Sequence, residues 1–417
     1  MDLLAFCADS LRRVWVARQI ACGLAAFAAF GCQDDTQPAT TVDVVLDTSQ
    51  ADTDSQGPGS DAQGPPANYA EAGPHPVGHT HLVLTDPQTQ RVLPTTVWYP
   101  AAESARTAAA TGISVATFLP DGPTRTALTA LLAQAPAGCT EPTAKSAPEA
   151  EPATGDPWPV VVFSHCHGCT RFSAHTLAER LASHGFAVVA PDHTGNTLME
   201  AEAGVTAPLT SAFLQVRGRD IRFVLDAVLA QDAAVLPKPL QGRLDASRVG
   251  AMGHSFGSVT TGLMAQDDPR IDAAFCLAAP IDNPLLAGVS AAKVKVPIAF
   301  VLAQEDNSIT EAGNLFLRQN YANVAGPAWL IELVDAGHWS FTDIAGLIDA
   351  FDPGCGEGLR MGDSVTPFAY VDPVVSRAMV ARHAAAFFAL HLRGEGSAKG
   401  TLELADPAAL ETVQSRP

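Results

Sequence analysis

Basic residues are scarce in this chain of 417 residues. Lysine and arginine number 25 against 44 aspartates and glutamates, which leaves a formal net charge of −19. A protein that binds nucleic acid needs clustered positive charge to neutralise phosphates, and no basic patch is visible along the sequence. The composition therefore argues against nucleic acid as a partner.

Long hydrophobic runs are also lacking, although 47% of the residues are hydrophobic. The first apolar run, IACGLAAFAAF at residues 20–30, is too short to span a bilayer, which takes about 20 apolar residues. It follows an arginine-bearing segment and ends just before Cys32, which is the layout of an export signal. Residues 1–32 are therefore predicted to be the signal peptide of an exported protein.

The AFGC ending at Cys32 resembles the bacterial lipobox, in which the cysteine becomes the lipidated first residue of the mature chain. Phe30 departs from that pattern, since a small residue is preferred at its position. We expect a lipoprotein of the bacterial cell envelope with a lipid anchor at Cys32. The alternative is plain secretion with Cys32 as a spare thiol.

Lysine and arginine are missing altogether between Arg18 and Arg91. Within this stretch, residues 33–70 are rich in Asp, Thr, Ser, Gln, Gly and Pro, a composition that cannot bury enough apolar surface to fold. We predict a disordered acidic linker there. The folded domain is expected over residues 77–393, followed by a C-terminal tail over residues 394–417.

Five cysteines fall within the expected domain. An odd number in an oxidising compartment allows one or two disulfides, and the sequence does not fix their pairing. Cys276, inside the apolar run FCLAA, is expected to be a buried thiol. The five are Cys139, Cys166, Cys169, Cys276 and Cys355.

From residue 158 onward, strand-like and helix-like segments alternate. WPVVVFSH and FAVVAPD read as buried strands on either side of the amphipathic helix pattern SAHTLAERLASHG, and DAAFCLA, VPIAFVLA and AWLIELV continue the alternation. This predicts an α/β fold with a mostly parallel sheet and helices on both faces. Residues 79–101 add two strands as an antiparallel edge, whereas residues 102–157 read as a surface insertion with one helical patch and little chemistry.

Residues 253–257 read G-H-S-F-G, a G-x-S-x-G pattern between a strand-like and a helix-like segment. A sharp strand-to-helix turn strains the serine's backbone, and only small residues at Gly253 and Gly257 leave room for it. Such a turn exposes the serine hydroxyl above the sheet, beside a helix N-terminus that favours negative charge. Ser255 is therefore predicted to be a nucleophile, against the alternative of a tight turn in a non-catalytic relative.

A serine hydroxyl needs a general base, which this order of elements places after a late strand. His338, in DAGHWS behind the strand AWLIELV, stands in the required position among twelve histidines. The acid that fixes the imidazole tautomer belongs between serine and histidine, at the end of a strand. Asp306 in LAQEDNS is our choice, with Glu305 and Asp282 as rivals and Asp335 interpreted as turn chemistry.

The oxyanion of a tetrahedral intermediate needs two backbone donors, one from the residue after the nucleophile and one from the loop after an earlier strand. Phe256 supplies the first, and His167 in FSHCHGC is expected to supply the second. Cys166 and Cys169 could close a small disulfide that stiffens this loop.

The HCHGC run has a second interpretation, as a metal or redox site. Zinc takes four converging ligands and no second cysteine pair matches, so we disfavour it. Asp192 and His193 end a neighbouring strand in APDHTGNT, where a capping or loop role is favoured over contact with a substrate.

Together these stretches resemble the α/β-hydrolase superfamily, particularly the branch with platelet-activating-factor acetylhydrolases, dienelactone-hydrolase-like proteins and cutinase-like polyester hydrolases. The resemblance covers roughly residues 77–393. It is carried by TDPQTQRVLPTTVWYP, PVVVFSHCHGC, LASHGFAVVAPDH, GRDIRFVLDAVLA, VGAMGHSFGS and DAGHWSF.

Two departures from the family pattern bear on the site. The acetylhydrolases carry their acid directly after the strand that follows the nucleophile helix, where this chain has Ala278, so the resemblance favours the cutinase-like position at Asp306. The HGxG-type oxyanion loop of the family is here the run at residues 165–168, which keeps His167 in the donor position.

We therefore expect an exported serine hydrolase of carboxylic esters, with Ser255, His338 and Asp306 as its triad and no cofactor. Export and a lipid tether place it among extracellular and lipid-like esters, so a short-chain or lipid-like ester is the expected substrate. A non-catalytic surface protein that keeps the scaffold for binding is the alternative. Dienelactone hydrolases proper more often use cysteine as nucleophile, so Ser255 argues against that chemistry.

Overall fold

In the computed structural model of the protein, residues 67–352, 354–405, 408 and 410–417 are described. The predicted signal peptide, the predicted anchor at Cys32 and the predicted linker up to residue 66 lie outside the described residues. Within the described part, no helix combines the length and the apolar character needed to cross a membrane.

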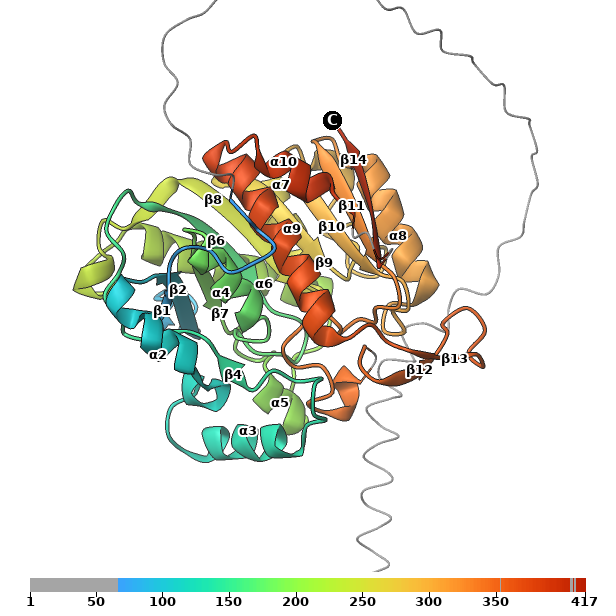
Figure 1. Ribbon diagram of the computed structural model, residues 1–417, viewed down its shortest axis with the longest axis horizontal. Coiled ribbons are helices and arrows are strands. Elements are labelled where there is room, and N and C mark those ends of the chain that lie inside the picture. The colour runs from blue at the N-terminus through green and yellow to red at the C-terminus, as the bar shows by residue number, and fades with distance from the viewer. Residues whose placement is uncertain (1–66, 353, 406–407, 409) are drawn as a thin grey trace, which may run out of the picture. The chain divides into compact units, whose positions relative to one another are not determined.

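One large mixed sheet forms the centre of the fold (Figure 1). Its strands are β1 (Val77–Thr85), β2 (Val92–Pro100), β5 (Ala147–Pro148), β6 (Trp158–Ser164), β7 (Ala187–Pro191), β8 (Leu244–His254), β9 (Ile271–Leu277), β10 (Ile298–Ala303), β11 (Ala328–Leu333) and β14 (Glu411–Arg416). They lie in the order β14-β11-β10-β9-β8-β6-β7-β2-β1-β5. The six strands from β11 to β7 run parallel, while β2 joins β7 and β1 antiparallel, as the sequence pattern predicted.

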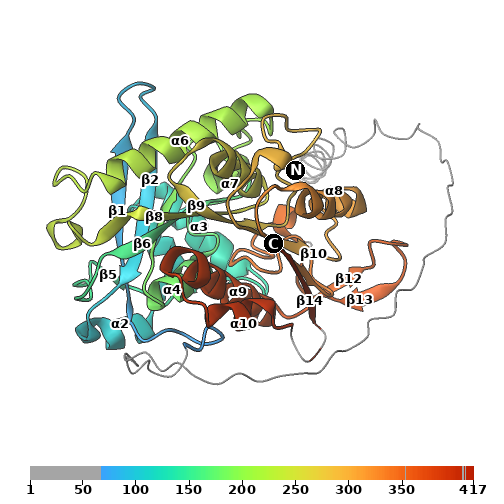
Figure 2. The same cartoon turned by 90° about the horizontal axis from the view of Figure 1, so that it is seen from above.

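Helices cover both faces of this sheet, as expected for strands that are apolar on both sides (Figure 2). The helices are α2 (Arg106–Thr111), α3 (Pro123–Gln134), α4 (His175–Ser183), α5 (Leu198–Glu202), α6 (Ser211–Leu229), α7 (Phe256–Asp267), α8 (Thr310–Asn323), α9 (Pro373–Arg393) and α10 (Ala398–Glu403). Successive residues of β6 point to opposite sides: Val161 packs in the core formed with α4 and α9, and Val162 in the core formed with α6, α7 and α8. These layers leave the loops at the carboxyl end of the parallel strands free to carry a site.

The C-terminal end of the chain belongs to the sheet. We predict a domain end at residue 393 from the sequence, but β14 pairs antiparallel with β11 over its whole length, from Ala328 opposite Arg416 to Leu333 opposite Glu411. The physical reason is that β11 would otherwise be an unpaired edge.

The insertion at residues 102–157 is fastened to the segment after β11. A disulfide joins Cys139 to Cys355, 216 residues apart, and Glu141 N–H donates to the carbonyl of Asp343 at 2.9 Å. The insertion also holds α3, close to the helical patch predicted from the sequence, and two short strands, β3 (Ile113–Ser114) and β4 (Thr143–Ala144). A second small sheet, β12 (Glu357–Leu359) with β13 (Pro367–Ala369), lies beyond Cys355.

Candidate active site

Ser255 occupies the turn between β8 and α7. Its backbone lies at φ 56° and ψ −119°, a conformation that L-residues adopt only under constraint. A Cβ added to Gly253 would overlap the backbone of Gly257, and one added to Gly257 would overlap the carbonyl oxygen of Ser164 on β6. The two glycines are therefore required by close backbone approach, as the sequence pattern indicated.

His338 and Asp306 meet at the carboxyl edge of the sheet. Asp306 follows β10 and is completely buried, and its Oδ2 lies 2.7 Å from Nδ1 of His338, in the loop after β11. A carboxylate oxygen only accepts, so Nδ1 of His338 carries a proton and donates it. In the neutral imidazole this leaves Nε2 with a lone pair, the form that a general base needs.

The rival acids serve other purposes. Glu305 and Asp335 both form ion pairs with Arg360, at 2.9 Å for Glu305, and Asp335 has the positive φ of 56° that fits the turn predicted for it. Asp282 accepts a hydrogen bond from the N–H of Ala291 at 3.0 Å. Of the four carboxylates considered, the structure places only Asp306 against His338.

His254 joins the nucleophile turn to the histidine loop. Its Nε2–H donates to the carbonyl of His338 at 2.9 Å, and the two rings lie 4.9 Å apart between centres. Complete burial keeps the pKa of His254 well below its usual value, so the ring is neutral. The residue next to Ser255 thus holds the backbone of the proposed base. This role has no signal in the sequence, because any residue fits this position of the motif.

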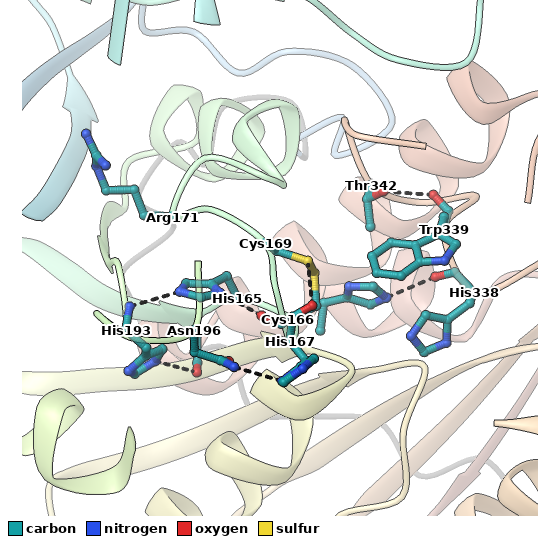
Figure 3. The surroundings of a disulfide bond; sticks show 12 residues. His165, Cys166, His167, Cys169, Arg171, His193, Asn196, His338, Trp339 and Thr342 are labelled. Carbon is teal, nitrogen blue, oxygen red and sulfur yellow. Dashed lines mark hydrogen bonds between the residues drawn. A yellow bond between two sulfur atoms is a disulfide. The ribbon is translucent and has the colours of Figure 1, made fainter. Parts of the chain in front are cut away.

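The two expected oxyanion donors belong to residues whose side chains lie near each other, with the rings of His167 and Phe256 6.3 Å apart between centres. Phe256 begins α7, and His167 lies in the loop after β6 (Figure 3). Among the described residues, neither backbone N–H donates to another protein group. They are therefore available to a developing oxyanion.

A disulfide between Cys166 and Cys169 closes the loop that carries His167. In Figure 3 it lies between the His165–His193 pair and the segment with His338 and Trp339. Both sulfurs are used by this bond, so the metal interpretation of HCHGC lacks its thiolates. No cluster of three or more metal-ligating side chains occurs within the part of the chain that the structure describes.

The histidines in and beside this loop are neutral. His165 accepts the N–H of His193 at Nε2 and donates from Nδ1 to the carbonyl of Cys166, at 2.9 and 2.7 Å. Burial, with Arg217 nearby, lowers the pKa of His165 and His193 well below the usual value and that of His167 to about 4. None of these rings carries a charge at neutral pH.

Asp192 and His193 have the loop role favoured from the sequence. Asp192 forms a buried ion pair with Arg171 and accepts its backbone N–H at 2.7 Å. His193 Nδ1 lies 3.0 Å from Asp220, and its Nε2 accepts from the hydroxyl of Ser164 at 3.0 Å. Both side chains are occupied by structural partners.

The strand order of the mostly parallel sheet, the helices on both of its faces and the strained turn at Ser255 define the α/β-hydrolase fold. The profile of the dienelactone hydrolase family matches residues 146–342, and that of platelet-activating factor acetylhydrolase, isoform II, matches residues 66–203. A solved structure of a ferulic acid esterase from Streptomyces cinnamoneus superimposes with a TM-score of 0.58 at 25% identity, covering 83% of this chain and 98% of that chain.

Two curated relatives illustrate the similarity in sequence. Cutinase est2 of Thermobifida alba is 28% identical over 193 residues, covering 45% of this chain and 55% of the cutinase. The platelet-activating factor acetylhydrolase of Cavia porcellus is 27% identical over 147 residues, covering 28% of this chain and 34% of that protein. The chain thus spans about half or less of the length of these relatives.

The protein belongs to the α/β-hydrolase superfamily, and parts of the chain are similar to dienelactone hydrolases, platelet-activating-factor acetylhydrolases and cutinases. This confirms the resemblance and the fold class predicted from the sequence.

Proposed function

We propose that the protein is an exported serine hydrolase of carboxylic esters that works through an acyl-enzyme. The observation that carries the proposal is the buried contact between Nδ1 of His338 and the carboxylate of Asp306, on a loop that His254 ties to the nucleophile turn. A scaffold kept only for binding would have no need of a strained serine beside such a pair.

In the first half-reaction, Nε2 of His338 takes the proton of the Ser255 hydroxyl as Oγ attacks the ester carbonyl. The backbone N–H groups of Phe256 and His167 stabilise the oxyanion of the tetrahedral intermediate. The intermediate collapses when its C–O bond to the leaving group breaks, and the proton on Nε2 passes to the departing alkoxide. Ser255 is left as an acyl ester.

The second half-reaction repeats these roles with water. Nε2 of His338 takes a proton from the water molecule that attacks the acyl carbon, and returns it to Oγ of Ser255 as the carboxylic acid leaves. Asp306 keeps its charge throughout and stabilises the imidazolium that forms twice per cycle.

The proposed substrate is a short-chain or lipid-like ester. The relatives are named as cutinase, platelet-activating factor acetylhydrolase and ferulic acid esterase, and all three names denote ester hydrolases. A lipid anchor at Cys32 would bring the enzyme to a membrane surface. Nitrophenyl esters of increasing acyl length, a phospholipid and a polyester film would discriminate among these substrate types.

Labelling with a fluorophosphonate probe tests the proposed chemistry. The wild-type protein should react at Ser255 in a 1:1 stoichiometry and lose labelling in Ser255→Ala. Ser247→Ala is the matched control, because Ser247 lies exposed on the same strand, β8, away from the turn. An unlabelled wild-type protein would favour the alternative, a non-catalytic binding protein.

The lipid anchor needs its own experiment. The full-length chain expressed in a bacterial host should partition into the detergent phase after extraction with Triton X-114. The Cys32→Ala variant should appear in the aqueous phase. If the two proteins partition equally, Cys32 carries no lipid anchor, and plain secretion is the remaining interpretation.

A further inference from the structure

Arg217 is a completely buried arginine on α6. Its guanidinium donates hydrogen bonds to neutral acceptors and forms no ion pair with a carboxylate of the residues that the structure describes. It donates from Nε to Thr260 Oγ1 at 3.1 Å, from Nη1 to Asn196 Oδ1 at 2.6 Å, and from Nη2 to Ser164 Oγ at 3.0 Å and to the carbonyl of His165. A buried charge with these partners calls for an explanation, because burial without a counter-ion is costly.

The partners of Arg217 lie on both sides of the proposed oxyanion hole. Ser164 and His165 come just before the loop with His167. On the other side, the guanidinium carbon lies 4.7 Å from the ring centre of Phe256, and Thr260 is one turn further along α7. One rigid planar group therefore contacts both elements that supply a backbone donor.

Asn196 extends this contact to His167 itself. Its side-chain oxygen accepts from Arg217, and its Nδ2 donates to Nδ1 of His167 at 2.8 Å. The carbonyl of Asn196 also accepts the N–H of Gly168 at 3.2 Å. Arg217 thus fixes the start of the loop directly and its middle through one intermediary.

Arg217 keeps its charge under ordinary conditions. Burial lowers its pKa to about 9, and Asp220, one turn further along α6, opposes that change. Hydrogen bonds from a cation are stronger and shorter than neutral ones, and the guanidinium fork fixes their directions as well as their lengths. A lysine would supply the charge without the fork.

We propose that Arg217 is a positioning residue that sets the two backbone donors of the oxyanion hole, Phe256 and His167, in register with each other. The inference rests on the proposed function. Removing the guanidinium leaves the carbonyl of His165 and the side-chain oxygen of Asn196 buried without their donor, so the loop must shift to satisfy them.

The test compares Arg217→Met and Arg217→Lys with a matched control, Arg393→Met. Arg393 makes the same two kinds of contact, stacking 4.5 Å from the ring centre of Phe186 and donating to the carbonyl of His184, but at the end of α9 and away from the loop. The hydrolysis of p-nitrophenyl acetate is measured per active site, with sites counted by the end-point stoichiometry of fluorophosphonate labelling. Counting sites removes the effect of any unfolded fraction.

Loss of one oxyanion donor costs roughly 100-fold or more in kcat. We expect kcat per site to fall by about that factor in Arg217→Met with KM within roughly threefold of wild type, since the hole acts mainly in the transition state. The kcat per site of Arg217→Lys should lie between those of the wild type and Arg217→Met. Arg393→Met should keep the wild-type kcat per site. Asn196→Leu provides a second variant if Arg217→Met does not fold, with an expected loss of about tenfold.

A purely structural role for Arg217 predicts a different pattern. The variants would then lose melting temperature and labelled fraction while the surviving sites kept wild-type kcat, and that result overturns the inference. A wild-type protein that neither labels nor hydrolyses any ester would instead refute the proposed function, so the two failures are distinguishable.

Discussion

Nδ1 of His338 lies 2.7 Å from Oδ2 of Asp306, and the other oxygen of that carboxylate accepts the N–H groups of Ser308 and Ile309 at 2.9 and 3.0 Å. Both oxygens therefore have fixed partners, and the carboxylate cannot rotate without losing two backbone hydrogen bonds. The imidazole is held in one orientation and in one tautomer.

Replacing Asp306 by Asn should lower kcat about 10³- to 10⁴-fold with little change in KM. The amide nitrogen would favour the opposite tautomer of His338, with the proton on Nε2, where it blocks the base. Glu305→Gln is the matched control, because Glu305 is the neighbouring carboxylate and pairs with Arg360 instead. Steady-state hydrolysis of p-nitrophenyl acetate measures both; equal losses would exclude Asp306 as the acid of the triad.

Removal of one disulfide should lower mainly the activity, and removal of the other should lower mainly the stability. The entropic effect of a disulfide grows with the loop it closes, and amounts to about 5 kcal/mol for the bond between Cys139 and Cys355 against about 2 kcal/mol for that between Cys166 and Cys169. The second bond, however, closes the loop with the proposed donor His167.

We expect Cys166→Ser/Cys169→Ser to lose about tenfold in kcat because the donor is less well positioned, with a small change in melting temperature. Cys139→Ser/Cys355→Ser should melt several degrees lower and keep its kcat per labelled site. Enzyme assays and calorimetry on both double variants provide the comparison. The opposite assignment, with activity following the long-range disulfide, would contradict the role given to the small loop.

Much of the fold followed from hydrophobic periodicity. The parallel strands β6 to β11 are short apolar runs bounded by turns, and the antiparallel edge of β1 and β2 showed in the DPQTQ turn between them. The insertion and the C-terminal end were harder, because their attachment depends on contacts distant in sequence. Neither the pairing of Cys139 with Cys355 nor the pairing of β14 with β11 has a local signal.

The residues around the proposed site also differ in how clearly the sequence indicates them. Ser255 stands in a motif whose glycines have a steric cause, and the chain order then selects His338. Arg217 was missed although a signal existed: it lies on the stripe of α6 that also holds Leu214 and Ile221, where an inward-facing residue is expected to be apolar. An arginine at such a position indicates a buried polar network.

Gly257→Ala should strongly reduce activity by distorting the turn. The added Cβ would overlap the carbonyl oxygen of Ser164 at the end of β6, so either α7 or the oxyanion loop must move away. We expect kcat to fall at least about 100-fold, together with a clear loss of melting temperature. Gly400→Ala on α10 has open space around its Cβ and should gain up to about 1 kcal/mol from helix propensity with unchanged kcat.

Loss of the His175 proton should make the protein less stable at alkaline pH. His175 on α4 is buried between Glu179 and Asp343, each 3.7 Å away, and it donates to the carbonyl of Glu141 in the insertion at 3.2 Å. Burial opposes its charge, but Asp343 and Glu179 outweigh that effect and raise the pKa of His175 to about 9. The charged ring thus joins α4, the insertion and the segment after His338.

The sign of the pH effect follows from linkage. A folded-state pKa of about 9, above the unfolded value of about 6.5, gives a stabilisation that is complete below about pH 6.5 and disappears as the pH rises to about 9. It amounts to at most about 3 kcal/mol. The melting temperature of the wild type should therefore fall across this range, and His175→Asn should melt lower at pH 6 with a flatter profile. His79→Gln is the control, because burial lowers the pKa of His79 to about 3 and that ring stays neutral throughout. A wild-type slope that survives in His175→Asn would mean that another group titrates.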